Sequence, residues 1–257
     1  GNVASSNGGG IYCYQSLMKV RSTLITANIA VSNGGGIYIE TCAPSIINTT
    51  IAGNKGSVGG GIYITTTSSV SIIANNIVAF NSSGIYRTGT GSPTLKNNCV
   101  YNPAGTNYTG VTAGPGSISD DPKFAAADYG NFHIQPDSPC INTGDNASIP
   151  AGMDYDIDGE NRIQTTTVDM GADESNGTTW PTTQTVIRVS PTGDDSNDGS
   201  TWALSKKTIQ NALYTTAAQG GEIWVKGGTY NENIYMLPYA TIYGGFDDTA
   251  TQRSDRN

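Results

Sequence analysis

Short apolar runs separated by glycine- and asparagine-rich segments fill the first half of the chain. The runs are three to six residues long and rich in β-branched residues, as at residues 23–26, 46–51 and 70–73. Such runs, bounded by Asn and Gly, are typical of strands joined by tight turns. Apolar residues do not recur at helical spacing before about residue 200. This half is therefore predicted to consist of short strands.

The pentapeptide Gly-Gly-Gly-Ile-Tyr occurs three times, and a shortened copy follows, at residues 8–12, 34–38, 59–63 and 83–86. The isoleucines of the four copies are spaced 26, 25 and 23 residues apart. Such a period is typical of stacked repeats. A period near 25 fits one coil of a right-handed parallel β-helix, in which each strand pairs with its equivalent about 4.8 Å away. We therefore expect an all-β solenoid.

Other repeat classes with a similar period do not fit the composition. Leucine-rich repeats need many leucines, but the first hundred residues contain only Leu17, Leu24 and Leu95. Calcium-binding nonapeptide repeats need an Asp in each glycine-rich turn, and these turns contain none. The β-helix remains the prediction for the coils.

Each position of the repeat has an expected role. Gly8, Gly9 and Gly10 would supply positive φ at a sharp corner, and in the strand that follows Ile would point inward and Tyr outward. Asn7 and Asn33 precede two corners and could hydrogen-bond between coils. Val58 holds the third such position, so that asparagine ladder would be incomplete.

The outward tyrosines would form a stripe down one face of the solenoid: Tyr12, Tyr38, Tyr63 and Tyr86. One interpretation is a platform on which carbohydrate rings stack. The other is an aromatic ladder that stabilises the sheet, and we favour it.

The last quarter of the chain has a different pattern. Apolar residues at helical spacing occur only at residues 203–218, where Ile209, Ala212, Leu213 and Thr216 share one face and Gly220-Gly221 ends the helix. Strands are predicted before and after it, at residues 186–190, 222–226 and 240–246.

Four sub-motifs at residues 120–174 resemble a known protein family. In order they are Asp120-Asp121-Pro122-Lys123-Phe124, Ser138-Pro139-Cys140-Ile141-Asn142-Thr143-Gly144, residues 154–162, and Val168-Asp169-Met170-Gly171-Ala172-Asp173-Glu174. This series resembles the closing segment of right-handed parallel β-helix proteins of bacterial and archaeal surfaces. These belong to the pectate-lyase-like superfamily and carry a C-terminal anchor or secretion module. Residues 185–246 resemble the unit that caps the N-terminal end of the same family.

The resemblance implies that the unit that caps the N-terminal end of the β-helix in this family stands last in this chain. It implies that residues 1–175 are the back part of a β-helix, with coils at 1–119 and the closing segment at 120–175. Residues 176–184 would be a linker, and 185–257 the front of the next β-helix. To cap residue 1 of the same chain, residues 185–257 would have to fold back past about six coils, which span roughly 29 Å. The nine linker residues reach at most about 30 Å, so this folding back is marginal. We expect a piece of a tandem or filament array, because the chain starts in mid-pattern.

Charge is low and uneven. Charged residues are 13% of the chain and the net charge is −8, with +4 on residues 1–119 and −12 on residues 120–257. A composition so poor in charge suits an extracellular solenoid, and an acidic chain excludes nucleic acid as a partner. No apolar run is long enough to span a membrane. The opposite signs would favour head-to-tail contacts between copies, unless acids simply collect in loops.

Catalytic residues are not expected. The resemblance implies relatives that cleave acidic polysaccharides, with clustered acids and an Arg or Lys base in lyases and paired carboxylates in hydrolases. Glu40 is the only acid before residue 120. We therefore expect a non-catalytic structural subunit of an extracellular filament or cell-surface adhesin, assembled from copies of itself. The alternative is a surface protein that binds polysaccharide or cleaves it as a lyase does.

Two acidic loops are candidates for calcium, the only cofactor considered. Asp154, Asp156 and Asp158 copy the opening of a calcium loop, but the twelfth position is Thr165, so this is not an EF-hand. Glu160 and Asp169 would complete the ligands. The alternative is an Asx-turn loop anchored by an Arg162 ion pair. The weaker candidate groups Asp194, Asp195 and Asp198, which also fit plain turns.

The four cysteines favour disulfides. Three pairings exist, and we prefer Cys13–Cys42 with Cys99–Cys140, each expected to join neighbouring coils. His133 is the only histidine and the cysteines lack metal-ligand spacing, so a zinc site is not expected. Glycosylation sequons occur at Asn48, Asn81, Asn107, Asn146 and Asn176.

Overall fold

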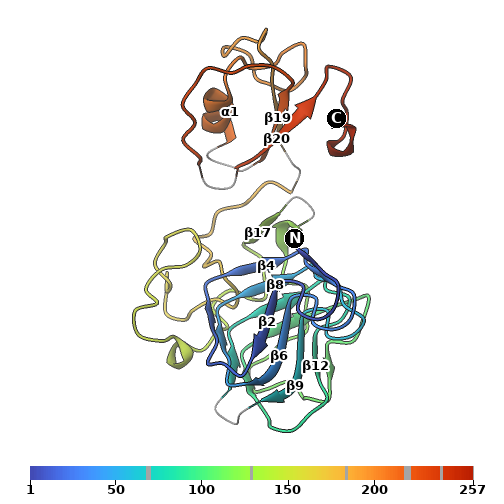
Figure 1. The fold of residues 1–257 in the computed structure, drawn as a ribbon. Coiled ribbons are helices and arrows are strands. Elements are labelled where there is room, and N and C mark those ends of the chain that lie inside the picture. Colours follow the sequence, from blue (N-terminus) through green and yellow to red (C-terminus); the bar gives the residue numbers. More distant parts are fainter. Residues whose placement is uncertain (68–70, 128–129, 183–184, 217–220, 238–239, 257) are drawn as a thin grey trace. The chain divides into compact units, whose positions relative to one another are not determined.

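The chain forms two compact units. A computed structural model describes residues 1–257 except 68–70, 128–129, 183–184, 217–220, 238–239 and 257. The first unit comprises Gly1–Phe124 and Phe132–Thr179, and the second comprises Ala125–Asn131 and Trp180–Asn257 (Figure 1). The two units are described separately below.

Three parallel sheets form the sides of the first unit. The chain visits them in turn, so that strands one coil apart are hydrogen-bonded neighbours, as expected for a β-helix (Figure 1). The first sheet contains β2 (Ile11–Tyr14), β6 (Ile37–Cys42), β9 (Ile62–Thr67), β12 (Ile85–Arg87) and β15 (Tyr108–Thr109). The second contains β3 (Lys19–Arg21), β7 (Ser45–Ile47), β10 (Ile72–Ala74) and β13 (Thr94–Lys96). The third contains β4 (Leu24–Thr26), β8 (Thr50–Ala52), β11 (Ile77–Ala79) and β14 (Cys99–Tyr101), and β1 (Val3–Ala4) pairs with β5 (Ile29–Ala30).

The repeated pentapeptide sets the strand register. Its isoleucines are directly paired from coil to coil, and so are its tyrosines. Ile37, Ile62 and Ile85 are buried. The sequence period therefore corresponds to one coil.

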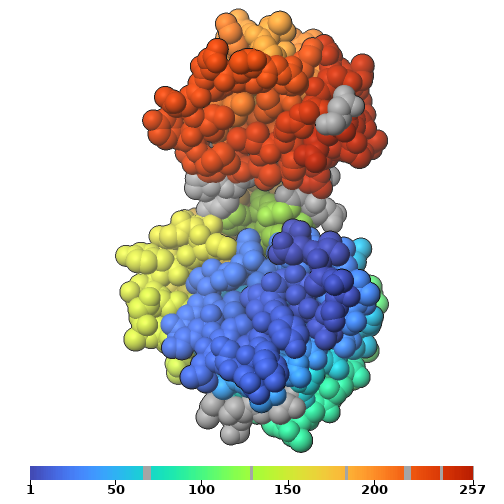
Figure 2. All heavy atoms as spheres, viewed as in Figure 1, coloured from blue at the N-terminus to red at the C-terminus, as the bar shows by residue number. Residues whose placement is uncertain are grey.

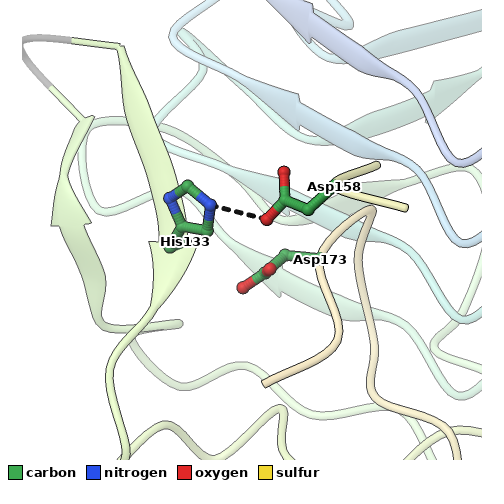
Figure 3. Close-up of side chains that lie close together, drawn as sticks. All are labelled: His133, Asp158 and Asp173. Carbon is green, nitrogen blue, oxygen red and sulfur yellow. Dashed lines mark hydrogen bonds and ion pairs between the residues drawn. The ribbon is translucent and has the colours of Figure 1, made fainter. Parts of the chain in front are cut away.

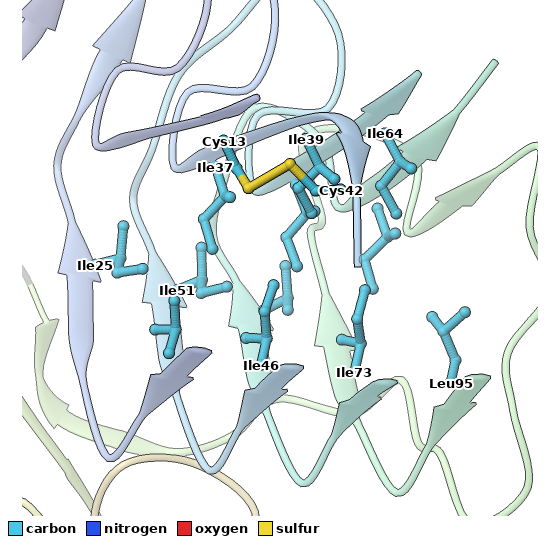
Figure 4. Close-up of a cluster of buried hydrophobic side chains, with 14 of the residues drawn as sticks. Cys13, Ile25, Ile37, Ile39, Cys42, Ile46, Ile51, Ile64, Ile73 and Leu95 are labelled. Carbon is cyan, nitrogen blue, oxygen red and sulfur yellow. A yellow bond between two sulfur atoms is a disulfide. The ribbon is translucent and has the colours of Figure 1, made fainter. Parts of the chain in front are cut away.

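Columns of aliphatic side chains fill the inside of the coils (Figure 4). Ile25, Ile51, Val78 and Val100 form one column, because they occupy paired positions of the third sheet. Each fully buried side chain of this kind contributes about 1.5–3 kcal/mol through removal from water. A coil therefore gains stability mainly by covering the coil before it.

The glycines at each corner are needed for two different reasons. Gly8, Gly34 and Gly59 have φ of +70°, +67° and +58°, as expected for a turn that other residues avoid. The second glycine of each copy lies outside that region, which corrects the expectation that all three need it. A Cβ on Gly35 would lie 2.4 Å from the carbonyl oxygen of Lys55, so close backbone approach requires glycine there.

Buried asparagines form a ladder between coils. The expected contact exists, since the main-chain N of Asn33 donates to Oδ1 of Asn7 at 3.0 Å. A longer ladder lies outside the repeated pentapeptide. In it, Oδ1 of each asparagine accepts hydrogen bonds from both the main-chain N and the Nδ2 of the asparagine one coil earlier. Its members are Asn28, Asn54, Asn81 and Asn102.

The segment after the coils does not extend the stack. Its part within the first unit, from Phe132 on, packs against the third sheet, and the yellow surface lies beside the blue coils (Figure 2). Asn48, Asn75 and Asn97 occupy equivalent left-handed turns, with φ of 47°, 57° and 47°. Nδ2 of Asn48 donates to the carbonyl of Asp169 at 2.9 Å, and the main-chain N of Asp145 donates to Oδ1 of Asn75 at 2.8 Å. The turn asparagines thus hold the closing segment.

Regular structure in the closing segment is sparse. Among its described residues are β16 (Phe124–Ala126), β17 (Asn131–Ile134) and the 3-10 helix η2 (Asn146–Ser148). An apolar cluster joins the segment to the outer face of β11 and β14 through Ile77, Cys99, Ile134, Cys140 and Met170. The segment is therefore fixed mainly by its contacts with the coils.

The second unit is a small parallel sheet covered by one helix. Its sheet has the order β18 (Val186–Val189), β19 (Gly221–Lys226) and β20 (Ala240–Phe246), and the unit also contains α1 (Ile209–Thr216) and the 3-10 helix η3 (Arg253–Asp255). The expected buried face of α1 is confirmed, with Ile209, Ala212, Leu213 and Thr216 inside. Among the described residues, no helix has the length and apolar character needed to cross a membrane.

Helix α1 begins six residues later than predicted. The side-chain oxygen of Thr208 accepts from the main-chain N of Asn211 at 3.2 Å, which is N-terminal capping geometry. Glu232 places its two oxygens 2.9 Å from the main-chain N atoms of Ile209 and Gln210. These contacts fix the start of the helix. Residues 217 and 218 of the predicted helix lie outside the described residues.

Candidate functional site

The repeat tyrosines form a stacked column on the first sheet. Their ring centroids lie 5.0, 5.2 and 5.3 Å apart from Tyr12 through Tyr38 and Tyr63 to Tyr86, with planes within 7° of parallel. Tyr38 and Tyr63 are buried, because each has another tyrosine on both faces. The column is therefore an aromatic ladder, and these two rings offer no face to a sugar.

Glu40 contacts the first ring of this ladder. The hydroxyl of Tyr12 donates to its Oε2 at 2.7 Å. That hydrogen bond raises the pKa of Tyr12 to about 12. The one acid of the coils is thus engaged with a ring, and no second carboxylate of the coils accompanies it.

The expected calcium loop is held together by main-chain donors instead. Oδ1 of Asp156 accepts from the N atoms of Asp158 and Glu160 at 2.8 and 2.9 Å, and Oδ2 accepts from the N of Glu174 at 3.0 Å. Asp154 is exposed. The carboxylate of Asp156 therefore closes a turn, and the five predicted ligands do not converge.

Asp169, the fifth predicted ligand, is buried in a separate network. Its two carboxylate oxygens accept from the N atoms of Asn142 and Ser175 at 2.6 and 2.7 Å. Burial raises its pKa. Beside it, Arg162 is 2% exposed and its NH2 atom lies 3.4 Å from Oε2 of Glu174. The Arg162 anchor of the alternative interpretation is present, and its partner is Glu174.

The second acidic loop does not gather its acids either. Asp194 and Asp198 each accept from the serine two residues later. Asp195 accepts from the N of Thr208 at 2.8 Å, before the helix start. The ammonium group of the buried Lys206 donates to the carbonyls of Asp195 and Asn197 at 3.2 and 2.6 Å. Because a lysine uses the loop's carbonyls, this loop is built as a plain turn.

A different set of residues does converge in the closing segment. Nε2 of His133 lies 2.7 Å from Oδ2 of Asp158, and one ligand atom from each of His133, Asp158 and Asp173 lies within 4.8 Å of the others (Figure 3). Among the described residues this is the one such group of three or more His, Cys, Asp or Glu side chains. Burial raises the pKa of Asp173 to about 7, whereas His133 opposes that shift.

Sequence reasoning missed His133 and Asp173. His133 is a buried residue of the short strand β17, and Asp173 lies inside a buried stretch that runs from Val168 to Glu174. A charged residue placed where the pattern requires an apolar one is the signal that could have identified both. The sequence could not show that they lie close together, because they are 40 positions apart.

The structure forms one of the two preferred disulfides. Cys13 and Cys42 are bonded inside the coils (Figure 4), but Cys99 and Cys140 are buried free cysteines. Cys140 lies in the closing segment and not in a coil, which corrects that expectation. The hydrogen bond with Cys140, together with burial, raises the pKa of Cys99. A thiol kept protonated reacts poorly in disulfide formation.

Two of the five sequons are inaccessible in the folded chain. Asn48 and Asn81 are buried. Their Nδ2 atoms, to which a glycan would be joined, donate to the carbonyls of Asp169 and Ile51 at 2.9 Å. Asn107 is half-buried, and Asn146 and Asn176 are exposed.

A hollow lies beside the last coils. Its volume is about 530 Å³, and it is lined by Arg87, Ser92, Pro93, Leu95, Gly110, Val111, Thr112 and Gly114. The guanidinium of Arg87 donates to the carbonyls of Gly89, Gly91 and Gly110. The charged group of the hollow is thus already engaged with the main chain.

Comparison with known families assigns the coils. Residues 1–118 match the family described as right handed beta helix region. The coils are a right-handed β-helix. This family match ends where the predicted coils end, at residue 118 against 119. No match was found among curated proteins or solved structures.

A second family match overlaps the end of the β-helix. Residues 86–152 match the family described as disaggregatase related. It spans the last coils and the first part of the closing segment, including Cys140. Asp158 and Asp173 lie beyond both matched ranges, so the group with His133 has no family assignment.

Proposed function

We propose that this protein is a structural subunit of an extracellular or cell-surface assembly in which β-helix units stack head to tail. The observation that carries the proposal is a pair of open strand edges of the same kind. In the part of the chain that the structure describes, the strands of the first coil have an unpaired parallel edge, and so has the last strand of the second unit's sheet. Parallel edges that are neither capped nor paired favour association with another chain.

The starting edge lies on the first coil. Within the described residues, β2, β3 and β4 each pair with one neighbour only, in the second coil. The N atoms of Ile11 and Gln15 donate to that coil at 2.9 and 3.2 Å. Because donors alternate along a strand of a parallel pair, the N–H groups of Tyr12 and Tyr14 are directed to the open side.

Apolar surface accompanies this edge. Val3 and Leu17 are 74% and 79% exposed, and Tyr12, Tyr14, Ile29 and Val31 are also exposed. Exposed apolar side chains at one end of a solenoid favour burial against another molecule. The first coil can therefore pair with a parallel strand of another molecule.

The matching edge belongs to β20. In the described part of the second unit, β20 pairs with β19 alone, and all three strands of the sheet are parallel. A parallel sheet that ends in β20 can be continued by a coil that begins in β2, with chain direction preserved. The +4 charge of residues 1–119 and the −12 charge of residues 120–257 support the same order.

The test is the size of the full chain in solution. We expect oligomers that lengthen with concentration in sedimentation velocity and form linear particles in electron microscopy. Tyr14→Pro removes an edge N–H and should shorten them, whereas Tyr14→Ala keeps that N–H and is the matched control. Far-UV circular dichroism checks folding of both. A chain that stays monomeric at every concentration would refute the proposal.

A second candidate is a surface protein that binds or cleaves polysaccharide. The hollow near Arg87 supports it, whereas the lack of paired acids on the coils favours the structural role. Incubation with polyuronates separates the two candidates. Release of unsaturated sugars would favour the lyase, and unchanged polymer is expected for the structural subunit.

A further inference from the structure

We propose that His133, Asp158 and Asp173 form a binding site for one divalent transition-metal ion, with zinc as the reference ion. The site lies wholly within the first unit. It is separate from the strand edges on which the proposed assembly rests, and it includes one of the five residues predicted to bind calcium.

The three side chains converge from different parts of the closing segment. His133 lies on β17, Asp158 in the loop that Asp156 closes, and Asp173 near the end of the closing segment (Figure 3). Zinc binds nitrogen and oxygen ligands at about 2.0–2.2 Å, which places tetrahedral ligand atoms about 3.4 Å apart. The ligand atoms already lie within 4.8 Å. Binding would open the 2.7 Å contact between His133 and Asp158 by under an ångström, and would draw any wider pair of ligand atoms together to about 3.4 Å.

The local charge favours a cation. His133 and Asp173 are 7% and 6% exposed, so two carboxylates and one imidazole share a site with little access to water. Asp156 adds a third negative charge nearby. The guanidinium of Arg162 does not neutralise them, because it contacts Glu174 and the carbonyl of Ala172. Buried charges are stabilised by pairing or by a metal ion.

The ligand types select among metals. One imidazole and two carboxylates suit zinc, cobalt or manganese, whereas calcium requires six to eight oxygen ligands. Three protein ligands leave a further position for water. We therefore expect tighter binding of zinc and cobalt than of calcium.

Contacts around the ligands hold two of them in place. Oδ2 of Asp173 accepts from the N of Ile134 at 3.0 Å, next to His133 in the chain. The N of Asp158 donates to Asp156 at 2.8 Å. Such outer contacts orient ligands before the metal arrives. An ion here would link β17, the loop that contains Asp158 and the stretch that contains Asp173, and would so stabilise the folded closing segment.

The experiment uses the full chain without an affinity tag, stripped of metal by a chelator that is then removed. Isothermal titration calorimetry measures Zn²⁺ binding. His133 is the only histidine, so nitrogen NMR of its imidazole reports whether the ion binds there. We expect one ion per chain, a shifted Nε2 resonance, and a cobalt complex with visible absorption.

Variants test the ligands individually. His133→Gln and Asp173→Asn should each weaken zinc binding by at least about tenfold, and Asp137→Asn, an exposed acid of the same segment, should leave it unchanged. Circular dichroism shows whether each variant folds. If a variant does not fold, the imidazole resonance of the unmodified chain still decides. An unshifted resonance at equimolar zinc, or undiminished binding by the folded variants, would overturn the proposal.

Discussion

The β-helix and the closing segment bury polar groups in opposite ways. In the β-helix the ladder asparagines each meet another asparagine one coil away, as Asn28, Asn54 and Asn81 do. In the closing segment unlike charged groups meet once, as Arg162 and Glu174 do. The first arrangement divides its stabilising contacts among many equivalent pairs. The second concentrates them in a few residues without equivalents.

The largest expected effect of a single change lies in the closing segment. Arg162→Met removes the guanidinium and leaves Glu174 buried without its ion-pair partner. Breaking a buried pair in this way costs about 3–5 kcal/mol. Urea unfolding of the variant measures the loss, and Arg256→Met, at an exposed position of the second unit, serves as the control. A loss below about 1 kcal/mol would show that the segment does not depend on this pair.

A slightly smaller effect is expected in the middle of the coils. Ile51→Ala empties part of a column between Ile25 and Val78. Deletions of this kind cost about 2–5 kcal/mol, and we expect about 3 kcal/mol in urea unfolding. Ile163→Ala, at an exposed position, should change stability little. Equal losses in the two variants would contradict the assigned interior.

The asparagine ladder tests whether its members are equivalent. Asn54→Ala removes the acceptor of the N and Nδ2 of Asn28 and the donor to the carbonyl of Ile25. Leaving buried groups without partners costs about 1–3 kcal/mol, and we expect about 2 kcal/mol in thermal or urea unfolding. Asn7→Ala, at the outer corner, removes one acceptor and should cost less. A larger loss of stability in Asn7→Ala than in Asn54→Ala would contradict the ladder's role as a source of stability.

The smallest effect is expected where the two regions meet through an ion pair. Nζ of Lys96 lies 2.6 Å from Oδ2 of Asp145, and this contact lowers the pKa of Asp145. Half-exposed pairs contribute about 0–1 kcal/mol, so Asp145→Asn should have a small effect at neutral pH.

The pH dependence of this pair has a defined sign. Because the pKa of Asp145 is lower in the folded state, its contribution is present above the ordinary value of 3.8 and lost as pH falls below it. The difference in unfolding free energy between the parent chain and Asp145→Asn, measured from pH 6 to pH 2, should therefore shrink toward acid. A difference that grew toward acid would contradict the assigned pair.

Much of the coil architecture was predictable, and its exceptions have local causes. The period of Ile11, Ile37 and Ile62 predicted both the fold and the register, because each coil repeats the same contacts. The buried column of asparagines was missed because it lies outside the repeated pentapeptide. The two corner glycines that do not need positive φ were misjudged because the space they require is set by the neighbouring coil.

The closing segment shows where prediction from sequence stops. Its acids suggested calcium, but Asp156 and Asp169 accept hydrogen bonds from main-chain N atoms. Only Asp158 joins a convergent group, and its neighbours there are 25 and 15 residues away. No spacing rule connects these positions, because the segment has no repeat and follows the shape of the coils beneath it.

The sequence by itself determined the β-helix, its coil length, the buried face of α1 and the scarcity of acids on the coils. These follow from periodicity, since neighbours in a solenoid are one repeat apart in the chain. Only the tertiary structure decided that the closing segment lies along the flank, that Cys99 and Cys140 remain thiols, and that His133 meets Asp158 and Asp173. Those contacts join positions of unrelated spacing, and packing against the coils, not local pattern, selects them.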